Sequence, residues 1–167
     1  MRVDAQAEVV AQPEVGGQRA QILQQPRDRS AITTIYFLLA AGECSRWHRV
    51  VPNFVIQGGG FTPDNMRKQT NPPIKNEADN GLKNLCYTVA MARTQDPHSA
   101  SAQFFINVVD NVMLDFRGPA PNEIGYTVFG RVVSGLEVLD AIERVPVDGE
   151  APRTRIELAR VRVERIK

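Results

Sequence analysis

Several serine, histidine and aspartate side chains could in principle form a hydrolytic triad. They are His48, His98, Ser99, Ser101 and Asp115. The sequence has no G-x-S-x-G motif, and serine and histidine in loops are usually turn formers rather than catalytic groups. The pattern therefore does not favour a serine hydrolase.

Two ligand-binding alternatives are also disfavoured by residue spacing. Cys44, His48, Cys86 and His98 are zinc-ligand types, but their C-x3-H and C-x11-H spacings match no compact zinc module. Gly58-Gly59-Gly60 lacks the lysine or further glycine of a nucleotide-binding loop. It indicates a tight turn or a close backbone approach instead, so neither a metal nor a nucleotide cofactor is expected.

Length and composition indicate one globular domain spanning residues 1–167. The chain has 167 residues, of which 43% are hydrophobic and 23% charged, with a net charge of +1. The near-neutral charge excludes a global field for nucleic acid or an anionic membrane. Two distant cysteines and the lack of a long apolar run favour a reducing, cytoplasmic location.

From Arg46 onward, short apolar runs separated by Gly, Pro and Asn predict β-strands. The predicted strands are Trp47–Val51, Val55–Gln57, Thr88–Arg93, Gln103–Val108, Thr127–Val133 and Ile156–Arg165. Leu136, Leu139 and Ile142 have helical spacing, which predicts a helix over Gly135–Val145 with Ser134 as its N-cap and Pro146 beyond its end. Many strands and few helices favour a barrel or sandwich.

Residues 1–30 are weakly patterned. A hairpin is predicted from Glu8–Gln12 through Val15-Gly16-Gly17 to Arg19–Leu23, because paired glycines supply the positive φ of tight turns. Residues 31–41 are apolar and are predicted to form a core helix or strand rather than a signal sequence.

Four segments together resemble the cyclophilin family of peptidyl-prolyl isomerases. They are WHRVVPNFVIQGGGF from Trp47, MAR from Met91, SAQFFIN from Ser101 and YTVFG from Tyr126. The run from Pro73 to Pro97 is similar to the bacterial cytoplasmic branch in particular. The resemblance covers residues 46 to about 145, and residues 1–45 form a divergent N-terminal segment before a catalytic core of residues 46–167.

The resemblance implies a mainly β fold, a closed eight-stranded antiparallel barrel with about two helices. It also implies an enzyme that rotates X-Pro peptide bonds in protein substrates and assists folding without a cofactor or metal. The implied partners are proline-containing polypeptides, bound by a monomer. The alternative is a non-catalytic module or chaperone that binds proline segments in the same groove.

The resemblance also assigns roles to individual residues. The implied catalytic residues are Arg49, Phe54, Gln57 and Phe105. The implied substrate-binding residues are Val55, Ala92, Arg93, Met113, Leu114 and Tyr126. Met113 stands where tryptophan or phenylalanine is usual, so weak cyclosporin binding is expected.

Overall fold

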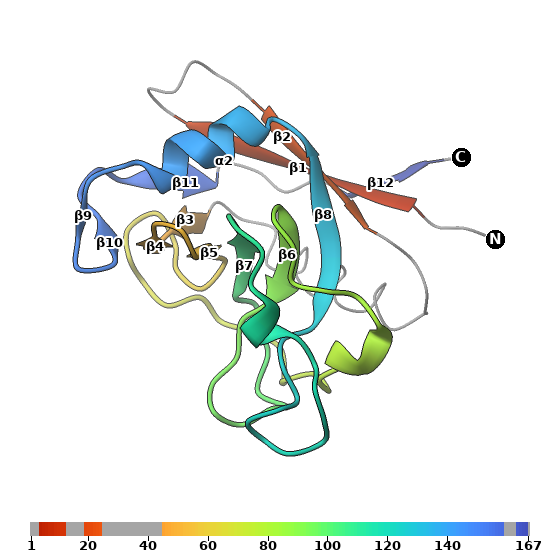
Figure 1. Ribbon diagram of the computed structural model, residues 1–167. Coiled ribbons are helices and arrows are strands. Elements are labelled where there is room, and N and C mark those ends of the chain that lie inside the picture. The colour runs from red at the N-terminus through yellow and green to blue at the C-terminus, as the bar shows by residue number, and fades with distance from the viewer. Residues whose placement is uncertain (1–3, 13–18, 25–44, 159–162, 167) are drawn as a thin grey trace.

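A computed structural model of the protein describes residues 4–12, 19–24, 45–158 and 163–166 (Figure 1). Among these residues, nine strands form one antiparallel sheet path, and β12 pairs with β1 at its side. The path strands are β1 (Asp4–Gln12), β2 (Arg19–Gln24), β3 (Ser45–Trp47), β4 (Arg49–Val51), β5 (Val55–Gly58), β6 (Thr88–Met91), β7 (Phe104–Asn107), β8 (Val128–Ser134) and β11 (Ile156–Leu158).

The sheet path runs in the order β3-β11-β1-β2-β8-β6-β7-β5-β4, and β12 (Val163–Ile166) pairs with β1 beyond β11. A separate two-stranded hairpin contains β9 (Val147–Asp148) and β10 (Ala151–Pro152). Every strand prediction after Arg46 is matched by at least one strand. The predicted strand Ile156–Arg165 corresponds to β11 and β12, with residues 159–162 outside the described residues.

The predicted strand Trp47–Val51 is two short strands, β3 and β4, separated by His48. These are also the two ends of the sheet path. The backbone N–H of His48 donates to the Gln57 carbonyl at 3.1 Å, and that of Arg46 donates to the Phe61 carbonyl at 3.2 Å. The segment 46–51 therefore pairs with β11 through β3, and its backbone N–H groups at positions 46 and 48 bond to the β5 region.

The predicted N-terminal hairpin forms. Strands β1 and β2 pair in antiparallel register from Gln6 opposite Leu23 to Val10 opposite Arg19. The hairpin lies between β11 and β8, so it joins the two sides of the sheet (Figure 1). Its turn, and the helix or strand predicted for residues 31–41, lie outside the described residues.

The central strands are buried on both faces, which creates two separate apolar clusters. Because side chains alternate along a strand, Phe104 and Ile106 of β7 enter the main core whereas Phe105 enters the second cluster. The main core also holds Trp47, whose ring meets Phe104 edge-on at 5.5 Å. Burial of each such large side chain contributes about 1.5–3 kcal/mol to folding.

The helix α2 (Leu136–Glu143) confirms the helical prediction and buries Val138, Leu139 and Ile142 in the main core. Its N-cap is Gly135 rather than the predicted Ser134. Gly135 has a φ of 72°, which glycine adopts without steric cost, and no side chain caps the helix. The turn out of β8 therefore places Ser134 at the end of the strand, one residue too early to cap.

The described residues contain one α-helix and two 3-10 helices, η1 (Ala78–Asn80) and η2 (Val112–Leu114), that the apolar pattern does not predict. The fold is mainly β, as expected. Within the described part of the chain, no helix is long and apolar enough to cross a membrane.

Candidate active site

The candidate site is built on one row of directly opposed residues across five neighbouring strands. Arg49 of β4 pairs with Gln57 of β5, and Gln57 pairs with Phe105 of β7. Phe105 pairs with Ala90 of β6, which pairs with Val128 of β8. Opposed residues share a face of the sheet, so the row changes from charged and polar at β4 to apolar at β6 and β8.

The apolar part of this row is the centre of the second cluster. Val55, Ala90, Phe105 and Val128 are buried there. Phe54, Leu82, Ala92, Leu114 and Tyr126 are partly buried and pack against them. The structure thus brings together six of the residues implied by the family resemblance: Phe54, Val55, Ala92, Phe105, Leu114 and Tyr126.

Aromatic packing orders this cluster, which we call the Phe105 cluster. The rings of Phe105 and Tyr126 meet edge-on, with centroids 5.6 Å apart and planes at 77°. Such an arrangement directs the positive ring edge at the negative ring face and adds about 0.5–1.5 kcal/mol to area burial. The two rings are held at right angles beside the partly exposed Phe54 and Leu114.

The polar end of the row is a chain of side-chain hydrogen bonds. Arg49 Nη1 donates to Gln57 Oε1 at 3.4 Å, and Gln57 Nε2 donates to Gln103 Oε1 at 2.8 Å. The Arg49 side chain is 30% exposed. Gln103 belongs to the SAQFFIN segment, but the residue assignments above do not include it.

Glu150, on the turn between β9 and β10, holds the other edge of the Arg49 guanidinium. Arg49 Nε donates to Glu150 Oε2 at 2.6 Å, and Nη2 donates to Oε1 at 3.0 Å. The backbone N–H of Val50 donates to the Glu150 carbonyl at 2.7 Å and fixes the turn against β4. The hydrogen bond from Arg49 lowers the pKa of Glu150 below its ordinary value.

His48 lies next to this chain of polar groups. Burial, followed by the nearby charge of Arg46, lowers the pKa of His48, so the ring is neutral at pH 7. The ring stands edge-on to Phe61 at 4.8 Å, and its buried Nδ1 has no hydrogen-bond partner. His48 therefore brings no positive charge near Arg49.

The Arg93 side chain, which contacts Tyr126, is also held by hydrogen bonds. Its Nε donates to the Gly125 carbonyl at 3.0 Å and its Nη1 to the Thr94 carbonyl at 2.9 Å. The guanidinium lies 4.5 Å from the Tyr126 ring centroid, in cation–π contact. Gly125 has a φ of 69°, and a Cβ there would lie 2.6 Å from the Asp115 backbone, so this turn requires glycine.

A hydrogen-bond network of buried asparagines holds the backbone of two residues that pack against the cluster. Asn111 Nδ2 donates to the Phe54 carbonyl at 2.9 Å and to Asn107 Oδ1 at 2.8 Å. Asn107 Nδ2 in turn donates to Thr88 Oγ1 at 2.9 Å, and Asn84 Nδ2 donates to the Leu114 carbonyl at 3.0 Å. These bonds fix the backbone at both partly exposed walls of the cluster, Phe54 and Leu114.

Met113 is placed differently from the other implied site residues. It lies on η2, is 60% exposed and is not a member of the Phe105 cluster. Its neighbour Leu114 does pack against the cluster. This position is compatible with the rim that the resemblance implies.

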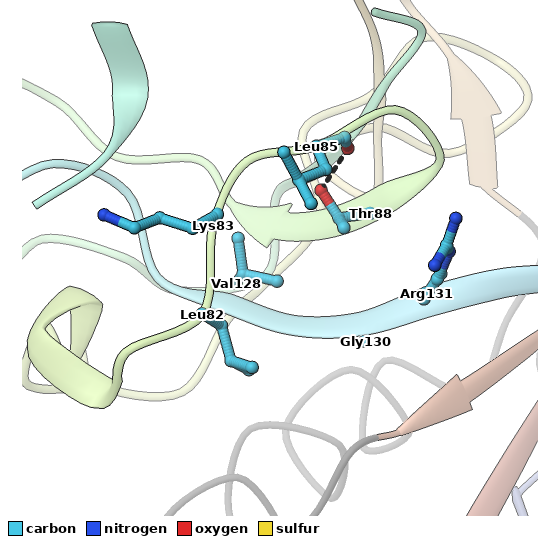
Figure 2. Close-up of a pocket in the computed structure, with 7 residues that line it drawn as sticks. All are labelled: Leu82, Lys83, Leu85, Thr88, Val128, Gly130 and Arg131. Carbon is cyan, nitrogen blue, oxygen red and sulfur yellow. Dashed lines mark hydrogen bonds between the residues drawn. The ribbon is translucent and has the colours of Figure 1, made fainter. Parts of the chain in front are cut away.

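Two pockets adjoin the cluster. An open cavity of about 650 Å³ is lined by Arg93, Thr94, Gln95, Pro121, Asn122 and Tyr126. A smaller one of about 110 Å³, shown in Figure 2, lies between the Leu82–Leu85 segment, Thr88 of β6 and β8, where Val128 and Arg131 line it. Tyr126 is shared by the large cavity and the cluster.

Residues of the hydrolase and zinc alternatives form local structural contacts. His98 Nδ1 accepts from the Asn76 backbone at 3.1 Å, and Ser99 Oγ donates to the Asp96 carbonyl at 2.7 Å. Cys86 Sγ contacts the Val108 carbonyl at 3.1 Å, and Cys44 lies outside the described residues. Gly59 has a φ of 87° and passes close to the Ala102 carbonyl, which confirms the predicted close backbone approach.

Comparison with known proteins identifies this fold. The fold is that of a solved cyclophilin-type isomerase from Cryptosporidium parvum, with a TM-score of 0.77 at 19% identity over 96% of this chain and 98% of that one. A second solved structure, in the presence of the dipeptide Ala-Pro, has a TM-score of 0.75 at 19% identity, covering 95% of this chain and 98% of that one.

The model of the cyclophilin type peptidyl-prolyl cis-trans isomerase family matches residues 42–163, and the chain belongs to this family. Two bacterial relatives are the isomerase cyp18 of Streptomyces antibioticus, 64% identical, and isomerase B of Escherichia coli K12, 60% identical, each over 99 residues. The matched part is 59% of this chain and 60% of each relative. A cupin superfamily model also matches residues 2–61, which is less than half of the chain.

Proposed function

We propose that this protein is a peptidyl-prolyl cis-trans isomerase that rotates X-Pro bonds in polypeptide substrates and so assists folding. The observation that carries the proposal is the cross-strand row in which Arg49 lies opposite Gln57 and Gln57 lies opposite Phe105. A charged donor beside an apolar aromatic cluster suits proline, because its apolar ring carries the nitrogen of the amide bond that rotates.

The chemistry requires stabilisation of a twisted amide. Planar X-Pro amides resist rotation by about 18–20 kcal/mol because of resonance. In the twisted state that resonance is lost and the proline nitrogen regains a lone pair. A donor that bonds to this lone pair stabilises the transition state more than either planar ground state, which is the condition for a faster rate.

Arg49 is the proposed donor. Its Nε–H and one Nη2–H donate to Glu150, and one Nη1–H donates to Gln57. A guanidinium carries five N–H donors, so one hydrogen on each terminal nitrogen stays available for the proline nitrogen. By analogy with removal of one oxyanion-hole donor, such a preorganised contact is worth about 3–4 kcal/mol in the transition state.

The remaining roles follow from the cluster. Phe54 and Phe105 pack on the proline ring, with Val55 and Leu114 as further apolar walls and Met113 at the rim. Gln57 orients Arg49 and contacts the peptide. The backbone around Ala92 and Arg93, together with Tyr126, binds the chain that flanks the proline. These assignments need no acid, base, nucleophile, metal or cofactor.

The proposed architecture is a single domain of residues 1–167 with a closed eight-stranded barrel. Two observations support closure. Strands β3 and β4, the ends of the sheet path, are separated only by His48, and β11 and β12 both pair with β1. Counting β3 with β4 and β11 with β12 as single interrupted strands reduces the sheet to eight.

We further infer that the protein acts as a cytoplasmic monomer on exposed X-Pro bonds. The near-neutral net charge of +1 and the two distant cysteines support this assignment. A proline-binding module without turnover is the competing function for the same groove.

A protease-coupled assay with a chromogenic X-Pro peptide tests the proposal. The protease cleaves only the trans isomer, so an isomerase accelerates the slow phase that follows cleavage of the trans fraction. We expect a rate that rises in proportion to protein concentration. A slow phase that stays at the uncatalysed rate, with the peptide still bound, would establish the binding module instead.

A further inference from the structure

The open cavity beside the Phe105 cluster contains a single charged side chain among its lining residues. Its walls come from Arg93–Gln95 on one side and from Pro121, Asn122 and Tyr126 on the other. Arg93 alone is ionic, whereas the others are polar, aromatic or apolar. Tyr126 forms the boundary between this cavity and the cluster. A peptide with its proline in the cluster therefore has neighbouring residues within reach of Arg93.

The Arg93 guanidinium is oriented but its charge is not neutralised. Bonds to the Gly125 and Thr94 carbonyls occupy Nε and one hydrogen of Nη1, and the Tyr126 ring supports one face. Carbonyl oxygens are neutral acceptors, so the full positive charge persists. The Nη2 hydrogens have no partner among these bonds.

No carboxylate of the described side chains forms an ion pair with Arg93, although four such pairs occur elsewhere among them. Asp96 is three residues away, but its Oδ1 accepts the backbone N–H of His98. Arg49, the other arginine of the site, is by contrast paired with Glu150. The two arginines thus differ: one is neutralised and the other presents an unpaired charge to an open cavity.

We propose that Arg93 selects substrates with an aspartate or glutamate close to the proline, the carboxylate binding in this cavity. The inference rests on the proposed isomerase function and names its substrate class. A guanidinium with free hydrogens matches the planar geometry of a carboxylate, and its orientation is already fixed by the protein. Less conformational entropy is therefore lost when the acidic side chain binds.

The test uses chromogenic peptides that differ at one position. Glutamate, glutamine or lysine is placed in turn at the position before the proline and at the position after it. The protease-coupled rate gives kcat/KM, and a fluorescence titration gives the Kd of each peptide independently of turnover. For at least one position we expect kcat/KM and affinity about fivefold higher for glutamate than for glutamine, with lysine the weakest.

Arg93→Gln is expected to reduce the glutamate-to-glutamine ratio to about one. Arg131→Gln is the matched control, because it removes the same charge from an exposed arginine that lines the other pocket (Figure 2). This control should keep the wild-type ratio. Melting curves of both variants, compared with wild type, verify that they are folded.

Equal rates and affinities for glutamate and glutamine peptides at every position would overturn the inference and leave the isomerase function intact. A preference that persists in Arg93→Gln would overturn it as well. Absence of turnover on all peptides would overturn the isomerase function, and the titration would then still decide whether Arg93 selects acidic peptides.

Discussion

Arg49 and Glu150 are 101 residues apart in the sequence, yet their side chains form a two-bond ion pair with N–O distances of 2.6 and 3.0 Å. The pair occupies the edge of the guanidinium formed by Nε and Nη2 and leaves a hydrogen on each terminal nitrogen. Glu150 is thereby a positioning residue for Arg49, acting through orientation rather than through contact with the substrate.

Glu150→Gln should lower kcat about two- to fivefold with little change in KM. The amide keeps the size of the carboxylate but has only one acceptor oxygen and no charge, so the guanidinium loses part of its fixed orientation. The range corresponds to the ordinary worth of an exposed ion pair, about 0.2–1 kcal/mol. Steady-state kinetics on one X-Pro peptide provide the measurement. An increase in kcat would show instead that the carboxylate competes with the substrate for Arg49.

The same pair predicts a pH dependence of stability. Arg49 lowers the pKa of Glu150 below its ordinary value of 4.5. A carboxyl with a lowered pKa in the folded state contributes stability above its unfolded pKa and loses it as the pH falls through the folded pKa. The difference in Tm between wild type and Glu150→Gln should be constant above about pH 5.5 and shrink below pH 4.5. A difference that grows on acidification would contradict the ion-pair account.

The asparagine network should be important for stability. Asn111→Ala removes the donor of the buried Asn107 Oδ1 and leaves the Phe54 carbonyl with the backbone N–H of Val108 alone. We expect the free energy of unfolding to fall by about 2 kcal/mol, as measured by urea denaturation. Asn71→Ala is the control, since Asn71 is exposed and should change stability by less than about 0.5 kcal/mol. Equal effects of the two substitutions would show that the network adds nothing.

Cyclosporin binding should be weak and should depend on position 113. A methionine there has no indole N–H and no flat, rigid face for the ligand. Met113 is 60% exposed, so Met113→Trp can be accommodated without disturbing the core. We expect the substitution to strengthen cyclosporin inhibition of the isomerase. Tight inhibition of the wild type would show that position 113 is not the inhibitor-contacting one.

The strands and the helix are predictable here because they depend on local pattern, whereas the pocket residues are implied by the family resemblance. Alternation along β7 separates Phe105 from Phe104 and Ile106, and the FVIQ and QFFI segments place Phe54, Val55 and Phe105 together. The N-terminal hairpin follows from a local signal as well, its two glycines.

Features that depend on contacts between distant loops are not predictable in this way. Glu150 reaches Arg49 only because the backbone of the β9–β10 turn bonds to Val50. The sequence does not mark Asn84, Asn107 and Asn111 as buried, and only the fold shows that all three are. Gly135 replaces Ser134 as the N-cap because β8 continues one residue further than the helical pattern suggests.

The central claim is that Arg49 acts in the transition state, and the direct measurement compares turnover with peptide affinity in Arg49→Ala, Arg49→Lys and Phe105→Ala. Removing an interaction that exists only in the transition state lowers kcat and spares binding. Arg49→Ala should therefore lose most turnover, a fall in kcat of roughly 10²–10³-fold, with nearly unchanged peptide Kd. Arg49→Lys should restore little, because a mobile ammonium cannot reproduce the planar fork.

Phe105→Ala should weaken both binding and turnover, since about 1–3 kcal/mol of apolar contact is felt by the proline in both isomers. The proposed mechanism therefore predicts that substitution at position 49 lowers turnover alone, whereas substitution at position 105 lowers both turnover and affinity. Full turnover in Arg49→Ala, with the variant folded, would contradict the catalytic role of Arg49 and leave proline-peptide binding as the function of the groove.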